Sequence, residues 1–331
     1  MAYTTIDNPE LYFQVKLYTG NNTGQSITFD GSEDMQPDMI WNKSRSNTEA
    51  HNMWDSVRGA EKYLTVNDTT TESDSGSTGV SSFNSDGFTV GSLDSLNDGS
   101  VTYVAWCWKE SATSGFDIVT YTGDGSDDRT VSHSLSASVN FVIVKRRNQT
   151  SNWLVQGDEV GSGFGQYMEL NATNAVQTAS DNIKSVSSSV LTLGTNGSCN
   201  EDSDTYVAYC FAEKQGFSKF GGYTGNGNAD GTFIYTGFKP AWVLFKRTDA
   251  TAKWYLVDNK REPFNDAASN LLYPDSNHAD EPDYGQADFL SNGIKIRSTD
   301  GGFNASGGTY VYMAFAEAPF VNSEGVPCNA R

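Results

Sequence analysis

The sequence has few cysteines, and their positions argue against a disulfide framework. It contains only Cys107, Cys199, Cys210 and Cys328. Cys107 and Cys210 occupy the same place in two copies of a line that the chain repeats, and the third copy has Ala314 there. A thiol that alternates with alanine is typical of a small core residue. We therefore expect neither disulfides nor a metal site.

Basic residues are also scarce, and long apolar runs are missing. Lys and Arg number 22 against 41 Asp and Glu, for a net charge of −19. A polyanion would be repelled at long range, so nucleic-acid binding is not expected. No apolar run approaches the roughly 18 residues of a membrane span, and the first residues lack the basic start and apolar core of a secretory signal. We expect synthesis in the cytoplasm, without membrane insertion.

Motifs of known catalytic sites are missing too. The three histidines, His51, His133 and His278, lie at no repeated position. The sequence has no H-E-x-x-H, P-loop, G-x-S-x-G or C-x-x-C pattern. It therefore predicts a protein that is not an enzyme and has no cofactor. The paired carboxylates of a glycan-degrading enzyme have no fixed spacing in sequence, so an enzyme of this class stays as the alternative of lowest rank.

The chain does contain one sequence pattern that occurs three times. The lines "TYVAWCWKE", "TYVAYCFAEK" and "TYVYMAFAEA" lie roughly 100 residues apart, and each is preceded at similar distances by "YTG" and by an apolar run that ends in lysine. Landmarks in constant order predict tandem repeats. The predicted organisation is an N-terminal arm at 1–12, repeats at 13–110, 116–214 and 217–320, and a C-terminal arm at 321–331.

Each predicted repeat has the features of an antiparallel β-sandwich. Runs such as "PAWVLFKR" and "KWYLVD" flank a polar turn and predict a β-hairpin, and no long window keeps a helical period. The segment that ends each repeat, which starts at Thr102, Thr205 and Thr309, is called the closing line, and it is apolar on both faces. In the first repeat Tyr103, Ala105 and Cys107 lie on one face and Val104, Trp106 and Trp108 on the other. A strand of this kind is covered on both sides. We predict an all-β protein of three sandwiches, of jelly-roll or concanavalin-like shape.

Charged residues at repeated positions are the main site candidates. Basic residues follow the first hairpin strand of each repeat: Lys43 and Arg45, Lys145 to Arg147, and Lys246 and Arg247. Acid–arginine pairs three residues apart occur at Asp55 and Arg58 and at Asp258 and Arg261, whereas the second repeat has Gly157 at the acidic position. These residues predict either a charged groove for a partner loop or anionic sugar, or a structural ion-pair cluster. Repetition favours the structural alternative.

Among the seven tryptophans, Trp54 is the candidate for an exposed, sugar-stacking ring. It precedes Asp55 in a polar tract, whereas the others lie in apolar strand contexts, where core packing is the rule. The tracts 69–82, 126–138 and 277–286 differ between repeats in length and content. Variable loops on a constant scaffold are where binding is tuned.

Several segments carry a family resemblance. "MAYTTIDNPELYFQVKLYTG", "QPDMIWNKSRS", "FNSDGFTVG" and "YTGFKPAWVLFKRTDA" resemble repeat domains of tail-fibre and other virion proteins of marine bacteriophages. The resemblance implies a non-enzymatic structural protein on the virion surface, either a tail-fibre or receptor-binding component or a capsid knob or decoration protein. Implied partners are other virion proteins, with self-association as a further option. The alternative is a lectin-like module that binds a host-surface glycan, for which variable loops would form the site.

Overall fold

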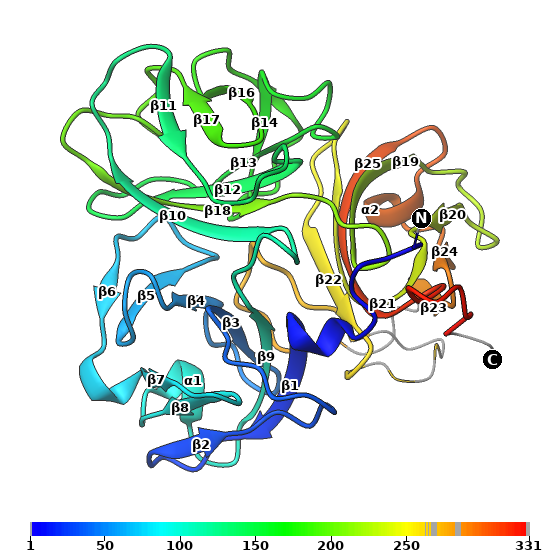
Figure 1. Ribbon diagram of the computed structural model, residues 1–331, viewed down its shortest axis with the longest axis horizontal. Coiled ribbons are helices and arrows are strands. Elements are labelled where there is room, and N and C mark those ends of the chain that lie inside the picture. The colour runs from blue at the N-terminus through cyan, green and yellow to red at the C-terminus, as the bar shows by residue number, and fades with distance from the viewer. Residues whose placement is uncertain (1, 262, 264, 266–269, 282–285, 329–331) are drawn as a thin grey trace.

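The computed structural model describes residues 2–261, 263, 265, 270–281 and 286–328 (Figure 1). The predicted all-β class is confirmed, since the elements are almost entirely antiparallel strands. The helical segments in the described part of the chain are single turns: η1 (Pro9–Leu11), η2 (Gly76–Thr78), α1 (Asp94–Asn97) and α2 (Gly301–Asn304). None of these helices is long and apolar enough to cross a membrane.

The first group of strands, unit 1 (13–108), has a six-stranded sheet facing a three-stranded one. The large sheet has the order β1-β9-β3-β4-β5-β6 and the small sheet the order β2-β8-β7. Their bounds are β1 (Phe13–Thr19), β2 (Gln25–Ile27), β3 (Met39–Ser44), β4 (Asn52–Asp55), β5 (Lys62–Thr65), β6 (Ser73–Asp74), β7 (Val80–Phe83), β8 (Phe88–Val90) and β9 (Thr102–Trp108).

Unit 2 (116–211) has the same arrangement. Its large sheet is β10-β18-β12-β13-β14-β15 and its small sheet is β11-β17-β16. The bounds are β10 (Phe116–Thr122), β11 (Arg129–Ser132), β12 (Phe141–Arg146), β13 (Leu154–Gly157), β14 (Gln166–Glu169), β15 (Gln177–Thr178), β16 (Ile183–Val186), β17 (Val190–Leu193) and β18 (Thr205–Phe211).

Unit 3 (218–319) pairs the sheet β19-β25-β21-β22 with the small sheet β20-β24-β23. An isolated bridge from Leu256 to Leu272 extends the large sheet at the edge where units 1 and 2 carry β5 and β14. The bounds are β19 (Ser218–Thr224), β20 (Phe233–Tyr235), β21 (Phe238–Arg247), β22 (Trp254–Asp258), β23 (Ala287–Leu290), β24 (Gly293–Ile296) and β25 (Thr309–Pro319).

The repeated closing line forms β9, β18 and β25, each a central strand of its large sheet. In unit 1, β9 pairs with β1 and β3, and Tyr18 stacks on Tyr103 with ring centroids 5.2 Å apart. The small face of β9, with Ala105 and Cys107, packs against the small sheet of its own unit. This explains why a thiol and an alanine are interchangeable on this face, since the two sheets approach closely there.

The aromatic faces of the three large sheets meet in one shared core. Trp106, Tyr209 and Met313 from the three closing strands all belong to it. Figure 1 shows the three units arranged around this centre. Each large sheet is therefore covered by its own small sheet on one face and by the neighbouring units on the other, which accounts for its apolar residues on both faces.

The start of the N-terminal arm lies on unit 3, and its end is hydrogen-bonded to unit 1. Ile6 is buried in the shared core, and the Tyr3 hydroxyl donates to the Gly237 carbonyl at 2.8 Å. Asp7 accepts hydrogen bonds from the backbone and hydroxyl of Ser323. The arm thus joins the beginning of unit 1 to the end of unit 3 and closes the circle of units.

Candidate functional site

The repeated charged residues lie mainly where two units touch. We call these interfaces the 1–2, 3–1 and 2–3 contacts, after the units that they join. Asp55 and Asp258 end the second strand of the hairpin, β4 and β22, so their carboxylates are held at fixed positions beside the next unit. Lys43, Asp55, Lys246 and Asp258 are all fully buried. None of these side chains lines an open groove.

At the 1–2 contact, a buried ion pair of unit 1 receives hydrogen bonds from unit 2. The Asp55 and Arg58 side chains have no exposed surface, and Arg58 Nε lies 2.5 Å from Asp55 Oδ2. The Tyr209 hydroxyl, from unit 2, donates to the same oxygen at 2.7 Å. Glu72 lies 3.1 Å from Arg58 Nη1 and accepts two hydrogen bonds from the Arg147 guanidinium of unit 2, each 2.9 Å long. The five side chains form one charge-paired network across the contact.

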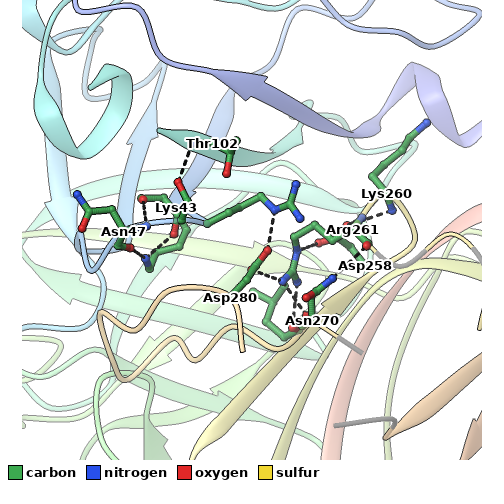
Figure 2. Close-up of polar contacts among 12 residues, drawn as sticks. Lys43, Asn47, Thr102, Asp258, Lys260, Arg261, Asn270 and Asp280 are labelled. Carbon is green, nitrogen blue, oxygen red and sulfur yellow. Dashed lines mark hydrogen bonds and ion pairs between the residues drawn. The ribbon is translucent and has the colours of Figure 1, made fainter. Parts of the chain in front are cut away.

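The 3–1 contact repeats this network with equivalent residues. Arg261 Nε lies 2.6 Å from Asp258 Oδ2, which also accepts from the Trp106 indole of unit 1 at 2.9 Å. Asp280 bridges two arginines, with Arg261 Nη1 at 2.9 Å and Arg45 Nε of unit 1 at 2.7 Å. Figure 2 shows Asp280 beside Arg261 and Asp258. Trp106 therefore takes the place of Tyr209, and Arg45 that of Arg147.

The 2–3 contact has uncharged residues at all five equivalent positions. Spacing from the repeated lysines identifies Gly157 and Val160 of unit 2 and Thr248 of unit 3. Val176 is equivalent to Glu72 through its backbone hydrogen bond, and Met313 to Trp106 through its place in the closing strand. Val160 and Met313 are buried in the shared core, and Val176 packs against it. The 2–3 contact thus lacks every charged member of the network at these positions, so no single charge is buried there without a partner.

A backbone hydrogen bond is common to the three contacts. In each, an amide of one unit donates to the carbonyl two residues after the repeated lysine of the next. The bonds are Glu72 N to Arg147 O at 2.7 Å, Asp280 N to Arg45 O at 2.7 Å, and Val176 N to Thr248 O at 2.9 Å. Since all three run in the same sense around the centre, the units form a closed ring.

The repeated lysines are buried and donate to backbone carbonyls. Lys145 Nζ reaches Thr69 of unit 1 at 3.0 Å, and Lys246 Nζ reaches Thr173 of unit 2 at 3.3 Å. Lys43 Nζ instead donates to carbonyls of its own unit. Burial lowers the pKa of each lysine to about 8. Their role is to satisfy loop carbonyls beside the contacts.

Aromatic donors complete the contacts, and sequence reasoning missed them. Trp153 Nε1 donates to Thr65 O of unit 1 and Trp254 Nε1 to Glu169 O of unit 2, both at 2.9 Å. At the equivalent position His51 accepts from the Trp41 indole at 3.1 Å, and burial lowers its pKa well below the usual value. The available signal was the constant spacing of these residues after the repeated lysine.

Two other predicted residues pair within their own units. Arg146 forms an ion pair with Asp204 in unit 2. In unit 3, Arg247 Nε lies 2.8 Å from Asp249 Oδ1. Neither pair crosses a contact between units. The ion pairs between units are made by the arginines two residues after the repeated lysine, Arg45 and Arg147.

The prediction of an exposed ring at Trp54 is wrong. Trp54 is fully buried between the sheets of unit 1, where its indole donates to Asn42 Oδ1 at 2.9 Å. Its polar neighbours mislead because they too are buried: His51, Asn52 and Asp55 are at most 1% exposed. The side chains of Asn52 and Asp55 form their hydrogen bonds inside the protein rather than with water.

Two hollows lie outside the charged networks. An open one of about 640 Å³ lies beside the N-terminal arm, lined by residues that include Tyr3, Gln215 and Glu324. A cavity of about 110 Å³ lies between units 1 and 3, lined by residues that include Gln14, Lys260 and Glu317. Ligand pockets usually reach about 300 Å³ or more. Within the described ranges, no group of three His, Cys, Asp or Glu side chains is placed to hold a metal ion.

The fold and its contacts define an all-β protein in which three sandwich units close into a ring around one core. The chain matches the model of the family described as domain of unknown function DUF7483 over residues 8–319, and it belongs to this family. The matched segment spans all three units and residues 8–12 of the N-terminal arm. No curated protein and no solved structure matches the chain.

Proposed function

We propose that this chain is a non-enzymatic structural protein on the surface of a bacteriophage particle. The observation that carries the proposal is the use of the repeated charged residues. The networks around Asp55 and Asp258 join the units to one another, and their charges are paired within the chain. Together with the resemblance to virion repeat domains, this favours a rigid building block over a catalyst.

Two positions on the particle fit a compact ring of sandwiches. A tail-fibre or receptor-binding component would present the variable loops to a host, and a capsid knob or decoration protein would dock on other virion proteins. The net charge of −19 suits a part that stays soluble before assembly. It does not favour contact with the packaged nucleic acid.

Localisation on purified particles tests the proposal. Antibodies against the folded chain, detected by gold labelling in electron microscopy, should bind intact virions. Labelling at the tail would assign the receptor-binding role, and labelling over the shell would assign the decoration role. If the chain is synthesised during infection but is missing from purified particles by both labelling and mass spectrometry, the proposal is wrong.

A further inference from the structure

An exposed aromatic pair on unit 3 has no part in the contacts between units. Phe233 and Tyr235 lie on β20, with Ile234 between them pointing into the sandwich. Phe233 is 44% exposed and Tyr235 is 54% exposed. Figure 1 shows β20 on the side of unit 3 away from the other units. Two exposed aromatic side chains on one face of a strand make this sheet a candidate binding surface.

The other units show that the fold does not require aromatic residues here. The strands β2 and β11 take the place of β20 in their small sheets, with the same neighbours in the ladder. Their outward positions hold small hydroxyl side chains, all of them exposed: Ser26 and Thr28 in unit 1, and Thr130 and Ser132 in unit 2. Phe233 and Tyr235 are therefore additions specific to unit 3.

Neighbouring residues hold the two rings in place. A Cβ atom added at Gly293 would lie 2.9 Å from atoms of the Phe233 ring, so this ring rests directly on the backbone of β24. The Tyr235 hydroxyl lies 3.4 Å from that of Tyr3, which is itself tied to the Gly237 carbonyl. A surface fixed in this way loses little conformational entropy when a ligand binds.

Charged side chains of both signs lie on the small sheet on the Phe233 side of the pair. Lys295, opposite Phe233 on β24, lies 2.8 Å from Asp230. Arg297 lies 2.6 Å from Asp288, and the Arg297 side chain is 46% exposed. These groups offer donors and acceptors that can form hydrogen bonds with hydroxyl groups.

From this arrangement we propose that the small sheet of unit 3 binds a neutral saccharide through Phe233 and Tyr235. One face of a pyranose ring carries C–H groups that can pack on an exposed aromatic ring, while its hydroxyls reach polar groups at the edge. An anionic sugar is disfavoured because the chain carries a charge of −19. This inference does not depend on where the chain sits on a particle.

Saturation-transfer NMR with the full chain tests the proposal. The probes are neutral gluco-, galacto- and manno-oligosaccharides, with a sialylated oligosaccharide as the anionic comparison. At least one neutral probe should receive saturation from the protein, and the sialylated one should not. In the double variant Phe233→Ser and Tyr235→Thr, which copies unit 1, affinity should fall by about tenfold or more.

The matched control changes the equivalent residues of unit 1, Ser26→Ala and Thr28→Ala. It should keep both the affinity and the melting temperature, and the double variant should keep the melting temperature. Binding that survives the double variant, or no binding to any neutral probe, would overturn the proposal. Concentration-dependent dimerisation that the double variant abolishes, without saccharide binding, would instead identify the pair as a protein contact and also overturn it.

Discussion

The 1–2 and 2–3 contacts perform the same task with opposite chemistry. Both join two sandwich units by an equivalent backbone hydrogen bond, Glu72 N to Arg147 O in one and Val176 N to Thr248 O in the other. The first surrounds this bond with a buried charged network, and the second with valine, methionine and threonine. The charges are therefore not needed to bring two units together in this geometry.

The comparison suggests that the charged network matters as a complete set. A buried ion pair gives little net stability over an apolar replacement, because desolvation offsets the attraction, but removal of one partner leaves a charge unpaired. The positions of Gly157, Val160 and Val176 have lost their charges together. Partial and complete replacement of the network should therefore have very different effects.

Removal of a single carboxylate should have the largest effect. Asp55→Ala leaves the buried Arg58 Nε and the Tyr209 hydroxyl without their acceptor. We expect the free energy of unfolding to fall by about 3–5 kcal/mol, measured by urea denaturation. Asp258→Ala should behave alike at the 3–1 contact.

The control for this variant is Asp249→Ala, which breaks the more exposed pair with Arg247. It should cost less than about 1 kcal/mol. A loss for Asp55→Ala no larger than that of the control would show that the 1–2 network contributes no more than a surface pair.

Complete replacement should cost less than the single change. The variant Asp55→Gly, Arg58→Val, Glu72→Val, Arg147→Thr and Tyr209→Met gives the 1–2 contact the residues of the 2–3 contact. We expect its unfolding free energy to lie within about 2 kcal/mol of the wild type, by the same denaturation experiment. If the variant with all five substitutions is less stable than Asp55→Ala, the network cannot be replaced as a complete set in the way we expect.

Acid should weaken the charged contacts selectively. Burial opposes ionisation of Glu72, but hydrogen bonds from Arg147 and the charge of Arg58 outweigh it and lower the pKa of Glu72. A lowered folded pKa gives stability that is complete above the unfolded pKa of about 4.3 and is lost as pH falls through the folded value. The melting temperatures of wild type and Glu72→Gln should therefore converge between pH 5 and pH 3. A constant difference over that range would show that Glu72 ionisation is not involved.

Alkaline pH should give the smallest effect, through the lysines. Burial lowers the pKa of Lys145 to about 8, whereas an unfolded lysine keeps its proton up to about pH 10.4. Between these values the unfolded chain binds more protons, so the stability contributed by this residue rises with pH. The free energy of unfolding of Lys145→Met should therefore lack this rise between pH 8 and pH 10, measured by denaturation at each pH. Parallel pH profiles of the two proteins would contradict this.

The sequence was sufficient to predict the fold class and the charged residues that matter. Alternation in the closing line indicated strands covered on both faces, and the spacing of Asp55 and Arg58 indicated an ion pair. Their further partners, Arg147 and Tyr209, lie far away in the sequence. Nothing in the local pattern of unit 1 identifies a residue of unit 2, so the networks across the contacts could not be predicted.

The burial of Trp54 shows a second limit of local patterns. Polar residues around a tryptophan normally indicate a surface segment. Around Trp54, other strands and loops supply hydrogen-bond partners for these residues. His51 N, for example, donates to Asn67 Oδ1, and Asn52 Nδ2 donates to Ser95 Oγ. Burial of polar residues depends on such partners, which only the assembled fold reveals.

The unlike contacts also fix the order of the units around the ring. In the opposite circular order, Arg45 would face Val176 in place of Asp280, and Glu72 would face Thr248 in place of Arg147. Each change would leave a charged side chain at the contact without its ion-pair partner. A ring of three identical sandwiches could close with either hand, whereas the side chains at these contacts favour one hand.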